Sequence, residues 1–246
     1  MSTEEEKKAE LVQAQSSALS KGGVRSLAAR GRAELRVKEE AEGWLKKGTE
    51  FRGRQLYEDA FRCFERGIQL DPNNPELQFM LGDSFDLGWG VPQDERKAFG
   101  WMRKSAKQGY ADAQDRLAWM FSSELDGLDS IAYGVRCDVA ESTRWWRKAA
   151  EQGHARAQEM LGISYREGVG VPKDFAQSAF WLRKAAEQGD RLAQCELGDL
   201  YAQGHGVPKD DEQAEIWYRK AAEQGDSDAQ AALATMRKTK PDRGAT

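Results

Sequence analysis

The amino-acid sequence predicts an all-α protein, an α-solenoid built from antiparallel helix pairs. The heptapeptide RKAAEQG occurs at 147–153, 183–189 and 219–225, and a variant, RKSAKQG, occurs at 103–109. The identical copies repeat every 36 residues. A Gly-x-Gly-Val-Pro turn occurs at 88–92, 168–172 and 204–208. A fixed period of this length is typical of a solenoid, in which each unit buries its apolar face against its neighbours.

The period divides the centre of the chain into four repeat units. They span 75–110, 111–154, 155–190 and 191–226, and unit two is eight residues longer than the other three. The additional residues belong to the segment 122–133, which contains Glu124, Asp126 and Asp129. Their spacing does not fit a calcium-binding EF-hand loop. We expect a longer surface loop here, with an ion or partner site as the alternative.

The first half of each unit predicts one helix. In unit three, Leu161 and Tyr165 are four residues apart and therefore share one face of that helix. Gly162 follows the leucine, and so small a residue lets the partner helix approach closely. The Gly-x-Gly-Val-Pro turn then ends the helix, because glycine accepts a positive φ and proline cannot continue a helix.

The second half of each unit predicts a second helix with signals at both ends. Its N-cap residues are Asp94, Asp138, Asp174 and Asp210. Three of these aspartates are followed by a capping-box residue, namely Glu141, Gln177 or Gln213, whereas Lys97 follows the first. Glycines at 109, 153, 189 and 225 stand at the C′ position. RKAAEQG therefore forms the last turns of this helix, with alanines at the packed face and charged residues toward water.

One tryptophan occupies the same position of the second helix in every unit. The four residues are Trp101, Trp145, Trp181 and Trp217. An aromatic residue at repeat spacing is more typical of a core than of a ligand site, and each ring can bury about 150–250 Å². We expect all four tryptophans to lie in the core.

The segments outside the four units have other expected roles. Residues 1–24 are a polar tail for which we expect no fixed structure, and residues 25–40 are expected to form a capping helix. After the last unit, we expect a second capping helix at 227–237 and a frayed tail at 238–246.

The units resemble Sel-one-like repeats (SLR), a branch of the tetratricopeptide repeat (TPR) superfamily. Across 75–226 they share the outline A-x-x-x-L-G-x-x-Y-x-x-G-x-G-V-x-x-D-x-x-x-A-x-x-W-x-x-K-A-A-E-Q-G. Residues 41–74 resemble an ordinary tetratricopeptide repeat, with Trp44, Gly48, Phe51, Ala60, Phe64 and Pro72 at its spacing and Lys47 where leucine is usual. The resemblance implies a right-handed superhelix. It also implies a non-catalytic scaffold or adaptor, whose concave groove is lined by first helices and holds a peptide or domain of another protein.

Composition restricts the partners and the location that we expect. The formal net charge is −4 and the pI is near 5.5, so nucleic acid is an unfavoured partner. No apolar run is long enough to cross a membrane, and the N-terminus is acidic where a secretory signal would be basic. The three cysteines, Cys63, Cys137 and Cys195, form no CxxC pair, which disfavours a structural metal or disulfide framework. We expect a cytoplasmic protein without cofactor or metal.

An enzymatic alternative is a β-lactamase-like hydrolase, an activity claimed for cysteine-rich relatives of the resembled family. The sequence disfavours it, because it contains no Ser-x-x-Lys, Ser-Asp-Asn or Lys-Thr-Gly motif and no paired cysteines. His154 and His205 stand where sister units have other residues. We expect both histidines to be exposed, permissive positions, and we predict no catalytic residue.

By analogy with the tetratricopeptide groove, four positions of each first helix would face a partner. The groove candidates are Glu76, Phe79, Asp83 and Asp86 in unit one, Asp112, Asp115, Trp119 and Ser122 in unit two, Arg156, Glu159, Ile163 and Arg166 in unit three, and Leu192, Cys195, Asp199 and Ala202 in unit four. The first half of this set is acidic with two aromatic residues. This predicts a basic, partly apolar partner segment, unless the charges are only solvated helix faces.

Two tryptophans depart from the repeat pattern. Trp119 occupies a position that holds Asp83 and Asp199 in sister units, and Trp89 lies at a turn tip as a second candidate contact. A third functional alternative is the carboxylate clamp of chaperone-binding tetratricopeptide proteins. That clamp needs basic and Asn residues, so the acidic first helices disfavour it.

Overall fold

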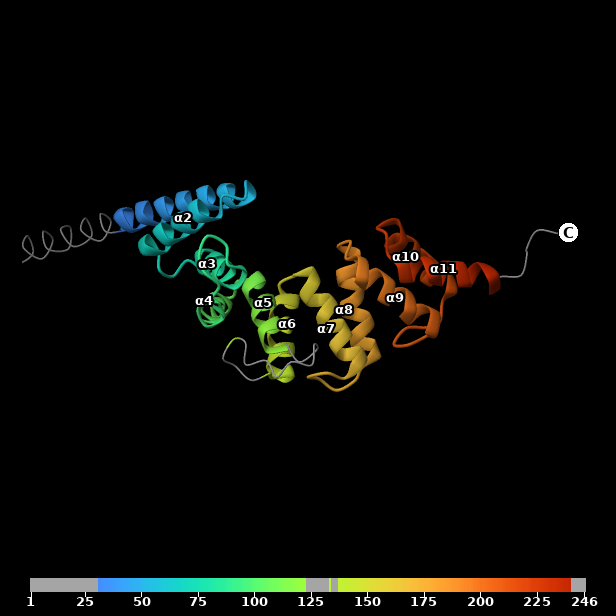
Figure 1. Ribbon diagram of the computed structural model, residues 1–246. Coiled ribbons are helices and arrows are strands. Elements are labelled where there is room, and N and C mark those ends of the chain that lie inside the picture. Colours follow the sequence, from blue (N-terminus) through green and yellow to red (C-terminus); the bar gives the residue numbers. More distant parts are fainter. Residues whose placement is uncertain (1–30, 123–132, 134–136, 240–246) are drawn as a thin grey trace, which may run out of the picture. The chain divides into compact units, whose positions relative to one another are not determined.

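The computed structural model describes residues 31–122, 133 and 137–239, and these residues form helices and turns without a strand. The expected tail 1–24 and most of the expected loop 122–133 lie outside the described residues. The chain divides into two bodies, residues 1–77 and 78–246. Each body is described by itself below, and the described parts of both consist mainly of helices (Figure 1). The fold is an all-α repeat solenoid.

The first body contains a helix over 31–53 and α2 (Tyr57–Leu70). The two helices approach closely at Gly48, because a Cβ there would lie 2.4 Å from Cε1 of Phe64. Leu77 packs against α2 in the same way, close to Gly67. Ala41 and Leu45 complete this small core. The glycine and phenylalanine of the tetratricopeptide-like pattern are thus a packing pair.

The capping helix expected at 25–40 is not separate where the structure describes it. Residues 31–53 form one continuous helix that crosses the expected boundary at residue 41. Residues 31–53 contain no proline that would end the helix. The glycine nearest the expected boundary is Gly43, where a Cβ would contact nothing within 4 Å. A single exposed glycine costs a helix only about 1 kcal/mol, so it does not stop one.

The second body contains most of α3 (Pro75–Leu87) and eight further helices in the part of the chain that the structure describes. They are α4 (Glu95–Lys107), α5 (Ala111–Ser122), α6 (Val139–Glu151), α7 (Ala155–Glu167), α8 (Phe175–Glu187), α9 (Arg191–Gln203), α10 (Asp211–Glu223) and α11 (Ser227–Thr239). From α4 to α11, each helix packs against the next one along the chain. No described helix is both long and apolar enough to cross a membrane.

The four predicted aspartate N-caps are present, but the capping box is replaced by another bond. Each Asp side chain accepts a hydrogen bond from the backbone N–H three residues later, for example Glu141 N–H to Asp138 at 2.9 Å. The backbone N–H of the cap residue, which a capping box would satisfy, instead donates to a carbonyl of the preceding helix. Asp174 N–H donates to Tyr165 O at 2.8 Å, and Asp94, Asp138 and Asp210 repeat this bond with Phe85, Phe121 and Tyr201. This bond fixes the turn between the two helices of a unit.

Two glycines of unit three show why the repeat needs them. A Cβ at Gly162 would lie 2.6 Å from Cγ of Leu182, so α7 and α8 meet there. Gly170 has a φ of 70°, and a Cβ there would lie 2.3 Å from the Val139 carbonyl oxygen of the preceding unit. The first glycine therefore packs one unit together, and the second brings its turn against the neighbouring unit.

The tryptophan column is buried in three units and only half-buried in the first. Trp145, Trp181 and Trp217 are 7–9% exposed, whereas Trp101 is of intermediate exposure. The prediction that all four lie in the core is therefore wrong for Trp101. In each unit the lysine of the heptapeptide lies over the tryptophan three residues before it, as Lys148 does at 3.9 Å from the Trp145 ring. That lysine covers the aromatic ring as well as facing water.

A ladder of glutamines joins successive units. In unit three, the amide of Gln188 donates to Oε1 of Gln158 at 2.8 Å and to the Gly153 carbonyl of unit two at 3.0 Å. Gln158 in turn donates to the Ala150 carbonyl at 3.0 Å. The equivalent glutamine pairs are Gln78–Gln108, Gln114–Gln152 and Gln194–Gln224. The glutamine of RKAAEQG is therefore a connecting residue.

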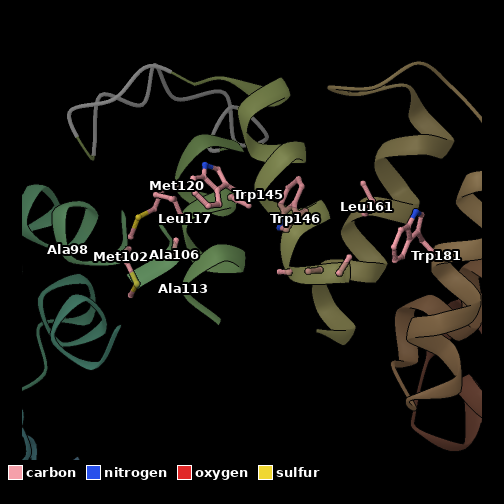
Figure 2. Packing of buried hydrophobic residues seen from close by; sticks show 14 residues of the cluster. Ala98, Met102, Ala106, Ala113, Leu117, Met120, Trp145, Trp146, Leu161 and Trp181 are labelled. Carbon is pink, nitrogen blue, oxygen red and sulfur yellow. The ribbon is translucent and has the colours of Figure 1, made fainter. Parts of the chain in front are cut away.

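The largest apolar cluster of the second body runs through units one, two and three. It extends from Ala98 and Met102 through Leu117 and Trp145 to Trp181 (Figure 2). Trp146 and Leu161 belong to it, so the junction between α6 and α7 lies inside this cluster. The first helices α5 and α7 are held in place by this core and by the glutamine ladder.

Candidate partner-binding surface

We name the groove candidates of the second body the first-helix strip, because all of them lie on α3, α5, α7 or α9. The strip comprises Phe79, Asp83, Asp86, Asp112, Asp115, Trp119, Ser122, Arg156, Glu159, Ile163, Arg166, Leu192, Cys195, Asp199 and Ala202. Glu76 belongs to the first body, so its place relative to the strip is not described. Phe79 is half-buried against Tyr110, with ring centroids 5.3 Å apart.

The acidic end of the strip is neutralised within the chain. The Asp86 carboxylate is 4% exposed and accepts hydrogen bonds from Arg116 Nε at 3.0 Å and from the Tyr133 hydroxyl at 2.8 Å. Burial, together with the bond to Asp86, raises the pKa of Tyr133 to about 12. Arg116 lies on α5, so this ion pair joins unit one to unit two. Asp86 is therefore a structural residue with little charge left for a partner.

Two further carboxylates, both on α5, lie near residues at the start of α7. The exposed Asp112 lies 3.3 Å from Nε2 of His154, and the buried Asp115 lies 3.9 Å from Nη1 of Arg156. The other oxygen of Asp115, Oδ1, is buried without a hydrogen bond from the described residues. Burial raises the pKa of the Asp115 carboxyl, and the charges of His154 and Arg156 oppose that effect.

His154 corrects the expectation that both histidines are exposed and permissive. It is half-buried and is the N-cap of α7, where Nδ1 accepts a hydrogen bond from the Ala157 N–H at 3.2 Å. Asp190 caps α9 at the equivalent position. Variation between units thus reflected two side chains that perform the same capping role. His205 is exposed and stacks on Phe175 at 4.5 Å.

Trp119 is half-buried, and two neighbours fix its ring. Trp146 of α6 packs edge-on against it, with centroids 6.0 Å apart at 86°, and the Arg156 guanidinium lies 4.7 Å from the ring centroid. Arg156 also approaches Asp115, so these residues form one connected group across α5 and α7. The tryptophan is therefore held in one orientation at the junction of units two and three.

On α7, Arg166 and Glu159 have different surroundings. Arg166 donates to Glu167 Oε1 at 2.8 Å and forms an ion pair with Glu196 of α9, which joins unit three to unit four. Glu159 is 6% exposed and receives no hydrogen bond or ion pair from the described residues. Burial and the nearby charges of Asp190 and Asp115 raise the pKa of Glu159 to about 7, against the opposing charge of Arg156.

A pocket of 240 Å³ lies at the junction of units two and three, and apolar atoms form most of its wall. Its lining residues are Ser122, Val139, Ser142, Trp146, Met160, Ile163, Ser164, Glu167 and Val169. Two of them, Ser122 and Ile163, belong to the first-helix strip. Trp146 joins the pocket to Trp119, because it lines the one and packs against the other. The repeat pattern predicts Ser122 and Ile163 as groove residues, but it does not predict the pocket.

Other side chains of interest do not gather into a site. Trp89 is half-buried at its turn. Among the described residues, Cys63, Cys137 and Cys195 form no disulfide, and burial raises the pKa of Cys195 to about 12, so this thiol is not activated. Among the described residues, no group of three or more His, Cys, Asp or Glu side chains is placed to hold a metal ion.

Comparison with known proteins identifies the repeat. The model of the family described as "Sel1 repeat" matches residues 75–110, 111–154, 155–190 and 191–226. A Sel1 repeat protein from Oxalobacter formigenes is 34% identical with a TM-score of 0.68, over 78% of this chain and 74% of that one. A protective antigen of uropathogenic Escherichia coli that displays an SLR fold is also 34% identical, with a TM-score of 0.70 over 82% of this chain.

The relatives differ in length and in how much they resemble the chain. The chain spans 43% of the length of the Escherichia coli antigen. Pseudomonas aeruginosa pilF is similar in fold alone, at 16% identity and a TM-score of 0.58, over 82% of this chain and 86% of that one. No curated protein matches the chain by sequence.

Proposed function

The chain belongs to the Sel1 repeat family, and we propose that it is a non-catalytic scaffold that binds another protein on its first-helix strip. Sel1 repeat proteins are generally protein-interaction scaffolds. One observation carries the assignment to this face. Trp119 presents a half-buried ring that Trp146 and Arg156 hold in place. A rigid aromatic side chain loses little entropy on binding, which is why tryptophan is enriched among residues that dominate interface energies.

The partner that fits this face is a basic, partly apolar segment. Asp86 and Asp115 are already paired with Arg116 and Arg156, so these two carboxylates are not the ones that would bind a basic partner. Glu159 is the strip carboxylate that is nine-tenths buried yet has no bonded partner among the described residues. A basic side chain of the partner would supply the missing counter-charge.

The experiment uses the full chain to select binders from a display library of random twelve-residue peptides. Trp119→Ala is expected to weaken the selected peptides by about tenfold or more, as loss of an interface residue worth over 1 kcal/mol would. Phe180→Ala is the matched control, because Phe180 is an exposed aromatic residue on the second helix α8. Equal affinity of the wild type and Trp119→Ala, with both folded, would contradict the assignment to this face.

A hydrolase remains the alternative from another class, and a direct assay separates the two. We expect the purified chain to hydrolyse the chromogenic β-lactam nitrocefin no faster than buffer does. Turnover that survives repurification would contradict a purely non-catalytic role. A cytoplasmic location stays a prediction from the sequence.

A further inference from the structure

The three junctions between repeat units can be compared position by position. In each junction, the twelfth residue of one first helix stands beside the sixth residue of the next. At the junction of units one and two these residues are Asp86 and Arg116, and at that of units three and four they are Arg166 and Glu196. Both junctions are therefore joined by an ion pair, with the charges exchanged between them.

The middle junction lacks this ion pair. Its twelfth and sixth residues are Ser122 and Met160, and both line the 240 Å³ pocket. A serine is shorter than aspartate or arginine, and a methionine adds no charge, so neither side chain fills or neutralises the space. The two positions that depart from the pattern of the neighbouring junctions therefore both lie in the wall of the pocket.

The dimensions of the pocket suit one side chain. Small-molecule sites commonly measure roughly 300–1,000 Å³, and this pocket is smaller, with a mostly apolar wall. Val139, Trp146, Met160, Ile163 and Val169 supply that wall. An aliphatic side chain that enters it exchanges water for apolar contact.

A charged residue lies one helical turn from the pocket. Glu159 precedes the lining residue Ile163 by four positions on α7, so both lie on the same face, with their Cβ atoms about 5–6 Å apart. Glu159 is 6% exposed and has no bonded counter-charge among the described residues. In an extended peptide, residues two apart are separated by about 6–7 Å. That spacing is comparable with the separation of Glu159 from the lining residue Ile163 on the helix face.

We propose that the pocket at the middle junction binds an aliphatic side chain of an extended partner segment, while Glu159 binds a lysine or arginine two residues away. The recognised pattern is therefore a basic residue, any residue and an aliphatic residue, in either chain direction. This inference rests on the proposed function, because it names the chemistry of the partner that the first-helix strip would hold. The occupant is another protein's segment, since no described residue forms an ion pair with Glu159 and the partner's basic residue would form one.

The test restores at the middle junction the ion pair of its neighbours. In the double variant S122D/M160R, the Asp86–Arg116 pair is copied onto the pocket, so the pocket is filled while the junction stays paired. Peptides selected on the wild-type chain from the random twelve-residue library should be enriched in the proposed pattern. They should bind S122D/M160R at least about tenfold more weakly, as measured by fluorescence anisotropy.

Two further variants separate the parts of the proposal. Glu159→Gln should bind peptides that carry the basic residue more weakly than the wild-type chain does. A peptide in which that lysine or arginine is replaced by glutamine should bind the variant and the wild type equally well. Ile216→Arg is the surface control, because Ile216 is exposed on α10, and its affinity should match the wild type. Thermal unfolding of each variant shows that the fold is retained.

Several results would overturn the inference. If Trp119→Ala weakens binding but S122D/M160R does not, the strip binds partners and the pocket does not, so the proposed function stands alone. A wild-type dimer in sedimentation that S122D/M160R separates would assign the pocket to a second copy. Peptide binding by a chain lacking residues 123–130, with none by the intact chain, would assign it to the chain's own inserted segment. Absence of any enriched peptide would count against both proposals.

Discussion

The middle junction of the repeat array differs from the two junctions beside it, although equivalent helices form all three. Beside it, ion pairs between a carboxylate and an arginine join successive first helices, as Asp86 and Arg116 do. In the middle, Ser122 and Met160 leave an apolar pocket next to Trp146. The glutamine ladder crosses all three junctions, where Gln114, Gln158 and Gln194 each donate to a carbonyl of the preceding unit. The repeat thus keeps its connecting bonds constant and varies the strip positions, where a binding site can arise without loss of the fold.

The largest expected effect concerns the core that all junctions share. Trp181→Ala should lower the free energy of unfolding by about 3–5 kcal/mol, because its side chain is 9% exposed within the largest cluster. Trp101→Ala should cost less than half as much, since Trp101 is only half-buried. Urea titration of both variants measures the difference. Equal losses would mean that exposure does not distinguish the two units.

The next effect tests the paired junction. Arg116→Met should lower the free energy of unfolding by about 2–3 kcal/mol at pH 7, because it leaves the buried Asp86 carboxylate without its cation. The Tyr133 hydroxyl still donates to that carboxylate, which limits the loss. Urea titration again measures it, and Arg103→Met, an exposed arginine, serves as the control. A loss below about 0.5 kcal/mol would show that the ion pair does not hold the junction.

Glu159 gives the middle junction a pH dependence. Its pKa is raised to about 7 in the folded chain from an ordinary value of 4.5, by burial and by Asp190 and Asp115, against Arg156. The folded chain therefore binds this proton more tightly than the unfolded chain does. The contribution to stability is fully present below about pH 4.5 and is lost as pH rises through 7.

We expect that loss to be about 2 kcal/mol, and Glu159→Gln should remove this part of the pH profile. Denaturant unfolding from pH 5 to pH 8 measures both chains. Identical profiles for the wild type and Glu159→Gln would contradict the assignment. A bound peptide with the proposed basic residue should reverse the trend, because it favours the ionised carboxylate.

The smallest effect sharpens the comparison most directly. In a double-mutant cycle of Ser122→Asp and Met160→Arg, the two substitutions should couple by about 1 kcal/mol in favour of the folded chain. The two single variants should together lose more stability than the double variant does. Ser122→Asp alone places a carboxylate against an apolar wall without a cation to pair with it. The free energies of unfolding of the four chains give the coupling. No coupling would show that the middle junction cannot adopt the paired arrangement.

Much of the fold could be predicted from the sequence because repetition exposes what each position does. The aspartate caps, the glycines with positive φ and the close contact at Gly162 each follow from local backbone chemistry. The exposure of Trp101 could not be predicted, since the repeat pattern places this tryptophan at the same position as the three buried ones. The N-cap role of His154 could not be predicted either, because an imidazole takes the place of the carboxylate there and the two share no sequence pattern.

The candidate site was harder to predict for a related reason. The strip carboxylates suggested an acidic groove, but their net effect depends on arginines 30 or 41 residues away, such as Arg116 for Asp86 and Arg156 for Asp115. The pocket lies where Ser122 and Met160 replace the charged residues of the neighbouring junctions. It can be recognised only once the helices are packed together. Trp119 and Ile163 could be named in advance because they differ from their sister positions.

The most direct measurement of the central claim is methyl NMR of the full chain with a selected peptide that contains the basic and aliphatic residues. We expect the methyl resonances of Met160 and Ile163 to shift most. Those of Met80, which stands at the sixth position of unit one, and of Ile216 on α10 should stay unchanged. Shifts at Met80 or Ile216 that equal or exceed those at Met160 and Ile163 would contradict a binding site at the middle junction.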